Sequence, residues 1–91
     1  MLHEFAKPFN FEGTEYPSID LNLDGLTGQD LLDAERDFTQ LGGSAMVLAT
    51  NQTYLAYVAA KAISKPIDFI LALPAKEFSK VVIQVQGFLL S

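Results

Sequence analysis

The sequence of 91 residues contains no cysteine and only one histidine, His3. The absence of cysteine excludes disulfides, thiol nucleophiles and thiolate zinc sites. A single histidine, at an end of the chain that we expect to fray, excludes a site with several histidine ligands. Basic residues are also scarce, with 6 against 11 acidic residues and a formal net charge of −5. Because nucleic-acid binding depends on neutralising phosphates, we expect no nucleic-acid partner.

Long apolar runs are absent as well. The C-terminal stretch from Val81 to Ser91 is charge-free, but it contains two glutamines and is far shorter than the roughly 20 residues that span a bilayer. The opening residues, MLHEFAKPFNFEG, carry an acid and a proline where a secretory signal would have a basic and then an apolar segment. We therefore expect no membrane association and an intracellular location. With 49% hydrophobic and 19% charged residues, the composition predicts a single packed domain over residues 1–91.

The N-terminal part of the chain has the alternation of β-strands. Lys7 to Tyr16 alternates aromatic and polar residues around Glu12-Gly13, where glycine tolerates the positive φ of a tight turn. A period of two continues to Leu23, with Ile19, Leu21 and Leu23 on one side. This pattern predicts a small antiparallel sheet with one solvated face.

The period becomes helical after Thr27. Thr27 and Asp30 have the spacing of a capping box, and Gly42-Gly43 is typical of a helix end. The apolar residues at helical spacing between them are Leu31, Ala34, Phe38 and Leu41. The sequence therefore predicts a first helix from about residue 28 to residue 41.

Further helices follow a loop of residues 44–50, whose own structure the sequence leaves open. Asn51 or Thr50 can cap a helix that runs through Ile63. Pro66 favours a short helical turn to about residue 71, and Pro74 precedes a final helix over residues 75–90. The chain thus predicts an α+β fold, in which an N-terminal β-hairpin or small antiparallel sheet is followed by three to four α-helices.

Candidate chemical sites are weak. Asp20 to Gly25 matches the first half of a calcium loop, but Leu31 stands where the bidentate carboxylate should be, so we favour a strand followed by a turn. Asp30, Asp33 and Asp37 are predicted on the exposed side of the first helix, as a solvated face or as an acidic ridge for a basic partner. Since no nucleophile, base and metal ligands converge, we expect no enzyme, catalytic residue, metal or cofactor.

The second helix carries a first candidate protein-binding surface. Tyr54, Tyr57 and Lys61 lie together at helical spacing, away from the Leu55, Val58 and Ala62 stripe. Aromatic residues on an exposed face often mark contact surfaces. The alternative is that both tyrosine rings pack on the hairpin.

The last helix carries a second candidate surface, because its apolar residues lie on two sides. Its broad core face comprises Phe78, Val81, Val82, Val85, Phe88 and Leu89. Ile83 and Leu90 project nearly opposite that face, seven residues apart. We therefore expect this helix to serve both as core and as interface, with Ile83, Phe88 and Leu90 as candidate contact residues.

Three stretches of the chain together resemble tail assembly chaperones of long-tailed bacteriophages. They are FNFEGTEY (Phe9 to Tyr16), LNLDGLTGQDLLDAE (Leu21 to Glu35), and LPAKEF (Leu73 to Phe78) leading to VQGFLL (Val85 to Leu90). Their order and spacing carry the resemblance, which spans roughly Lys7 to Leu90. The resemblance implies a non-enzymatic protein of virion morphogenesis. Such chaperones coat the helical tape-measure protein, keep it soluble, help tail-tube subunits polymerise around it, and are not part of the mature virion.

The resemblance also implies partners and a location. These are the tape-measure protein, possibly the tail-tube protein, and further copies of the same chain, in the cytoplasm of the bacterial host. Many such phages also make a C-terminally extended version by ribosomal frameshifting, and this chain resembles the shorter product. The alternative function is a small acidic adaptor or antitoxin-like protein-binding module, which would also combine net negative charge with apolar faces.

Overall fold

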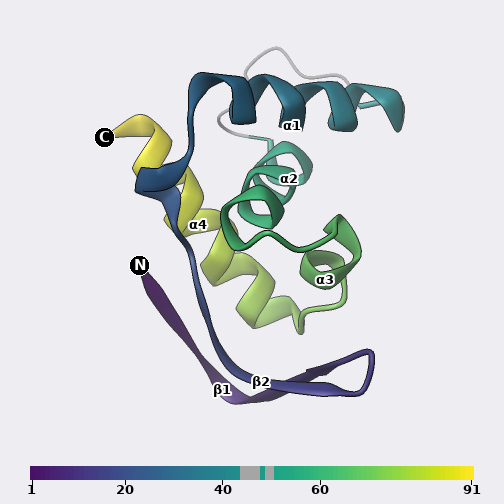
Figure 1. The fold of residues 1–91 in the computed structure, drawn as a ribbon, viewed down its shortest axis with the longest axis vertical. Helices are drawn as coiled ribbons and strands as arrows, with labels where there is room; N and C mark the ends of the chain where they lie inside the picture. The colour runs from purple at the N-terminus through teal and green to yellow at the C-terminus, as the bar shows by residue number, and fades with distance from the viewer. Residues whose placement is uncertain (44–47, 49–50) are drawn as a thin grey trace.

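The computed structural model describes residues 1–43, 48 and 51–91 (Figure 1). Its elements are, in chain order, β1 (Leu2–Phe11), β2 (Thr14–Asp20), the 3-10 helix η1 (Leu23–Gly25), α1 (Gly28–Gln40), α2 (Gln52–Ile63), α3 (Ile67–Leu71) and α4 (Ala75–Leu90). The two strands pair antiparallel and the helices follow them, which confirms the predicted α+β fold.

The hairpin turns at the predicted residues. Glu12 and Gly13 both have positive φ, 50° and 82°, as a two-residue turn of type I′ requires. The strand register shifts between Glu4 and Phe9, so the pairing is interrupted around Ala6. This interruption leaves backbone groups of β1 available for partners outside the sheet.

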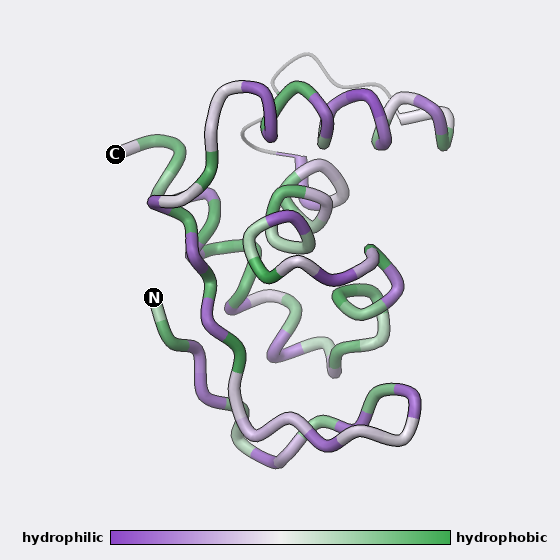
Figure 2. Tube along the Cα trace, viewed as in Figure 1, coloured by the Kyte–Doolittle hydropathy of each residue, from purple (hydrophilic) through white to green (hydrophobic). Residues whose placement is uncertain are grey.

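The predicted capping box of α1 is present. The backbone N–H of Asp30 donates to Thr27 Oγ1 at 3.3 Å, and the backbone N–H of Thr27 donates to Asp30 Oδ2 at 2.9 Å. Ala34 and Phe38 face the core as expected, whereas Leu41 is 72% exposed. Leu41, the last of the apolar residues at helical spacing, is the C-cap, because the helix ends at Gln40. Figure 2 shows hydrophilic and hydrophobic residues alternating along α1.

Helix α2 lies at the centre of the helical part, between α1 on one side and α3 and α4 on the other (Figure 1). Asn51 caps it, since Asn51 Oδ1 accepts the backbone N–H of Tyr54 at 3.0 Å; the other candidate cap, Thr50, lies outside the described residues, as does most of the loop 44–50. Its buried residues are Tyr54, Leu55, Ala56, Tyr57, Val58, Ala59, Ala60 and Ala62. Because the alanines are small, neighbouring helices can approach α2 closely, and α2 is therefore buried on nearly all sides.

The hairpin is held on the helices by an aromatic cluster around α3. Phe69 is fully buried, and its ring meets those of Phe9, Phe11 and Tyr16 edge-on at centroid distances of 5.2, 5.0 and 5.1 Å. The predicted alternation after β2 is also present, with Ile19, Leu21 and Leu23 buried. The buried residues of sheet and helices form one cluster, and α4 closes one side of it.

Candidate protein-binding surface

The exposed side of α4 forms a continuous strip along the helix, here called the outer ridge. Its residues are Lys76, Ser79, Lys80, Ile83, Gly87 and Leu90. Ile83 is 64% exposed and Leu90 is 62% exposed, so both project outward as predicted. Between them, one turn from each, lies Gly87. The ridge is therefore apolar over its C-terminal half, on a helix whose opposite side is core.

The core side of α4 follows the helical wheel that the sequence predicted. Val81, Val82 and Val85 are buried, and Phe78, Phe88 and Leu89 are half-buried against the core. Phe88, which we predicted as a contact residue beside Ile83 and Leu90, thus packs on the domain itself and is not part of the ridge. The candidate surface is reduced to the two outward aliphatic residues and their neighbours.

Gly87 is exposed on this ridge. Among the residues that the structure describes, a Cβ built on Gly87 would meet no atom within 4 Å, so no close packing against them requires a glycine there. Glycine inside a helix destabilises it by roughly 0.5–1 kcal/mol relative to alanine. The residue therefore leaves open space on the ridge at a cost in stability.

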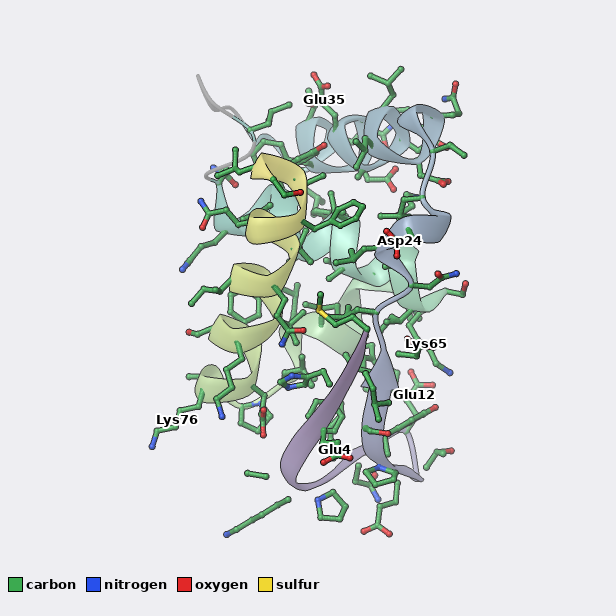
Figure 3. The ribbon with its side chains drawn as sticks, turned by 90° about the vertical axis from the view of Figure 1, so that its left-hand side faces the viewer. Glu4, Glu12, Asp24, Glu35, Lys65 and Lys76 are labelled. Carbon is green, nitrogen blue, oxygen red and sulfur yellow. The ribbon has the colours of Figure 1, made fainter. Side chains whose placement is uncertain are left out.

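The N-terminal half of the ridge is basic. Within the described part of the chain, neither Lys76 nor Lys80 forms an ion pair, and Figure 3 shows Lys76 pointing away from the body of the protein. Of the other basic side chains, Lys61 and Arg36 pair with Asp37, Lys65 Nζ donates to the Tyr16 hydroxyl at 3.1 Å, and Lys7 has no ion-pair partner among the described residues. The ridge therefore presents two free positive charges on an acidic protein.

The predicted surface on α2 is wrong. Tyr54 and Tyr57 are each only 6% exposed, because α1 covers the side of α2 that the sequence left without a partner. The Tyr54 ring packs on Phe38 at 6.3 Å, and its hydroxyl donates to the Leu31 carbonyl at 3.5 Å. The alternative, packing on the hairpin, is also wrong for Tyr54. Burial is the main cause that raises the pKa of both phenols.

Lys61 is likewise bound within the chain. Its Nζ lies 3.1 Å from Asp37 Oδ2. A hollow of about 320 Å³ lies beside this pair, lined by Asp37, Tyr57, Lys61 and Lys65 among others. Lys61 is paired with the Asp37 carboxylate, whereas Lys65 contacts the neutral Tyr16 hydroxyl.

The acids of α1 lie at the surface and form local contacts there. Asp30 is engaged in the capping box, Asp33 accepts from Gln29 at 2.9 Å, and Asp37 binds Lys61 of α2. All three are partly exposed. The contacts of Asp30 and Asp33 are exposed and agree with a solvated face, whereas Asp37 is bound to α2.

Sequence reasoning missed a buried polar cluster that joins β1 to α4. His3 was expected to fray, yet it is 6% exposed and its Nε2 lies 3.0 Å from Glu77 Oε1. The Ala6 N–H donates to Glu77 Oε2 at 2.8 Å, and Gln84 Nε2 lies 3.0 Å from His3 Nδ1. Glu77 thus replaces the strand partner that Ala6 loses at the register shift. The signal in the sequence that could have indicated an inward His3 is its spacing of two from Phe5, because residues i and i+2 of a strand lie on the same face and Phe5 is apolar.

The cluster stabilises the carboxylate form of Glu77. The hydrogen bond from the Ala6 N–H is the main cause that lowers the pKa of Glu77, and His3 and Lys80 act in the same direction against the opposing effect of burial. His3 Nε2 faces Glu77 Oε1 and His3 Nδ1 faces the Gln84 amide nitrogen, each at 3.0 Å. Both ring nitrogens are then occupied, so His3 is not placed to activate a nucleophile or to hold a metal.

Comparison of the chain with protein-family models, curated proteins and solved structures gives no match. Over residues 1–43, 48 and 51–91, no three histidine or acidic side chains gather as metal ligands. In the same part of the chain, no helix combines the length and apolarity that crossing a bilayer demands. The fold and its surface define a small acidic α+β domain with an apolar and basic ridge on its last helix.

Proposed function

We propose that the protein is a tail assembly chaperone of a long-tailed phage and that it binds the tape-measure protein through the outer ridge of α4. The observation that carries the proposal is the exposure of Ile83 and Leu90 on one side of a helix whose other side is core. Large exposed apolar groups aligned on one element are typical of surfaces that a second chain covers. The resemblance of the sequence to such chaperones supplies the identity of that chain.

The chemistry of the ridge suits a helical partner. An apolar strip along a helix packs against the apolar stripe of another amphipathic helix, with side chains of one filling the grooves of the other. A tape-measure protein, as the resemblance implies, is long and largely helical and would expose such stripes before the tube forms around it. The net charge of −5 would keep the complex soluble while the stripes are covered.

In this proposal the role is non-enzymatic and is performed in the host cytoplasm, before the mature virion forms. Binding to tail-tube protein and self-association belong to the same proposal. Neither requires a catalytic group, a metal or a cofactor.

Co-expression tests the function and the surface together. The tape-measure protein of the same genome is produced alone, with the wild-type chain, and with the Ile83→Glu/Leu90→Glu variant, and its soluble fraction is measured. The matched control is Leu32→Glu/Leu41→Glu, which adds the same charge at leucines that are 60% and 72% exposed near α1.

We expect the wild type and the control to keep the tape-measure protein soluble and the ridge variant to lose this activity, because a carboxylate in an apolar contact must be desolvated. If the wild-type chain does not change tape-measure solubility, the function is wrong, and the adaptor alternative becomes the better hypothesis. If the ridge variant acts like the wild type, the surface is wrong.

A further inference from the structure

We infer that the segment bound by the outer ridge is an acidic amphipathic helix, which crosses α4 at Gly87 and places its carboxylates against Lys76 and Lys80. This inference rests on the proposed function, since it specifies the chemistry of the partner at the same surface. It follows from the geometry of the ridge and from its charges.

The geometry fixes where a partner comes closest. Ile83 and Leu90 are two helical turns apart, about 10 Å along the axis, and Gly87 lies between them. A helix that packs on this strip meets two aliphatic side chains with a gap between them. Because none of the described residues would meet a Cβ at Gly87, the partner's backbone or a large apolar side chain can approach the helix there. The glycine that costs stability in the free protein thus gains a role in the complex.

The two lysines of the ridge indicate which residues should flank the apolar stripe of the partner helix. Lys80 lies one turn before Ile83 and Lys76 lies one turn earlier, and both are exposed. No exposed carboxylate side chain belongs to the ridge, and neither lysine has an ion-pair partner among the described residues. The nearby Glu77 is buried and bound to His3 and Ala6. Acidic residues at one end of the partner helix would complement these two lysines and fix its direction.

The same charges disfavour a second copy of α4 as the occupant. A second ridge would bring two more lysines and no carboxylate side chain, so the basic ends would remain without partners. The complementary surface therefore belongs to another protein, and a homodimer through this ridge is an outcome that the experiment must detect.

Two synthetic helical peptides serve as probes. They share one apolar stripe with leucines at positions i, i+4 and i+7 and differ only in the flanking residues, which are glutamate in one and lysine in the other. Their affinities are measured by fluorescence anisotropy at low and at physiological salt, with the wild type, Lys76→Glu/Lys80→Glu, Gly87→Ala and Gly87→Leu. Sedimentation velocity of each protein alone reports dimers.

We expect the wild type to bind the acidic peptide at least about tenfold more tightly than the basic one, with a difference that narrows as salt increases. The Lys76→Glu/Lys80→Glu variant should reverse this preference. Gly87→Ala should raise the melting temperature of the free protein, because the added methyl group meets only open space, and Gly87→Leu should weaken binding of the acidic peptide at least about tenfold without unfolding the domain.

Four results would each overturn the inference. They are equal affinity for both peptides, an unchanged preference in the Lys76→Glu/Lys80→Glu variant, undiminished peptide binding by Gly87→Leu, and a dimer that competes with the peptide.

The co-expression assay distinguishes failure of the inference from failure of the proposed function. If Ile83→Glu/Leu90→Glu loses tape-measure solubility while Lys76→Glu/Lys80→Glu and Gly87→Leu retain it, the proposed function stands and the acidic helix is wrong.

Discussion

Glu77 offers the sharpest test of how the hairpin is attached to the helices. Its carboxylate binds the Ala6 N–H at 2.8 Å and His3 Nε2 at 3.0 Å, in a site where His3 and Glu77 are each 6% exposed. Glu77→Ala leaves the buried His3 Nε2 without a partner and also frees the part-buried Ala6 N–H. Since an unpaired buried group costs about 1–3 kcal/mol and the Ala6 N–H can turn to water, the loss of unfolding free energy should be about 1–3 kcal/mol. Glu77→Gln keeps the shape of the side chain but replaces the charged acceptor of both hydrogen bonds with a neutral amide. It should lower the unfolding free energy by about 2 kcal/mol.

The effect should depend on pH in a defined direction. Because the folded state lowers the pKa of Glu77, the carboxylate stabilises the fold fully above its unfolded pKa. This contribution is lost as pH falls through the lower, folded pKa. Urea unfolding of wild type and Glu77→Gln between pH 7 and pH 3 should therefore give free energies that differ at neutral pH and converge in acid. The His3→Gln variant, measured in parallel, shows how much of this difference in unfolding free energy depends on the contact between Glu77 and the imidazole.

Two results would refute this reasoning. Equal stability of Glu77→Gln and the wild type at pH 7 would mean that the buried carboxylate does not hold the hairpin. A difference that stays constant down to pH 3 would mean that the variant acts through packing instead of charge.

Further predictions concern the fold. Thr27→Ala should lower the unfolding free energy by about 1 kcal/mol through loss of the capping box, as measured by urea unfolding. Phe69→Leu keeps an apolar side chain but loses three edge-on ring contacts, so it should cost about 2–4 kcal/mol and speed amide hydrogen exchange in the hairpin; unchanged exchange would contradict the role of the aromatic cluster. Val85→Ala should cost about 2 kcal/mol by leaving a cavity, whereas Ile83→Ala should stay within about 0.5 kcal/mol of the wild type. Calcium should leave the melting temperature unchanged because Leu31 replaces the required acid, and a clear rise at physiological salt would contradict this.

The helices and the turn were predictable because their signals are local. Thr27 and Asp30 are three residues apart, Glu12-Gly13 is a dipeptide, and Pro74 stands directly before α4. The outward position of Ile83 and Leu90 also follows from the wheel of a single helix. Such features need no knowledge of how distant segments meet.

The errors arose where distant segments meet. The exposed face assigned to Tyr54 and Tyr57 was a side of α2 that α1 covers, and the sequence of α2 alone cannot show that neighbour. His3 lies 74 residues before Glu77, and a buried pair at that separation leaves no periodic pattern. The same holds for Asp37, because its partner Lys61 lies on another helix and the sequence of α1 alone does not show it.

The central claim is that the outer ridge of α4 binds the tape-measure protein, and the most direct test is sedimentation velocity of purified components. A soluble helical fragment of the tape-measure protein is mixed with the wild type, with Ile83→Glu/Leu90→Glu, or with Leu32→Glu/Leu41→Glu, after circular dichroism has shown that all three are folded. We expect a faster-sedimenting complex with the wild type and with the control, and separate components with the ridge variant. A complex of undiminished amount with the folded ridge variant would contradict the claim.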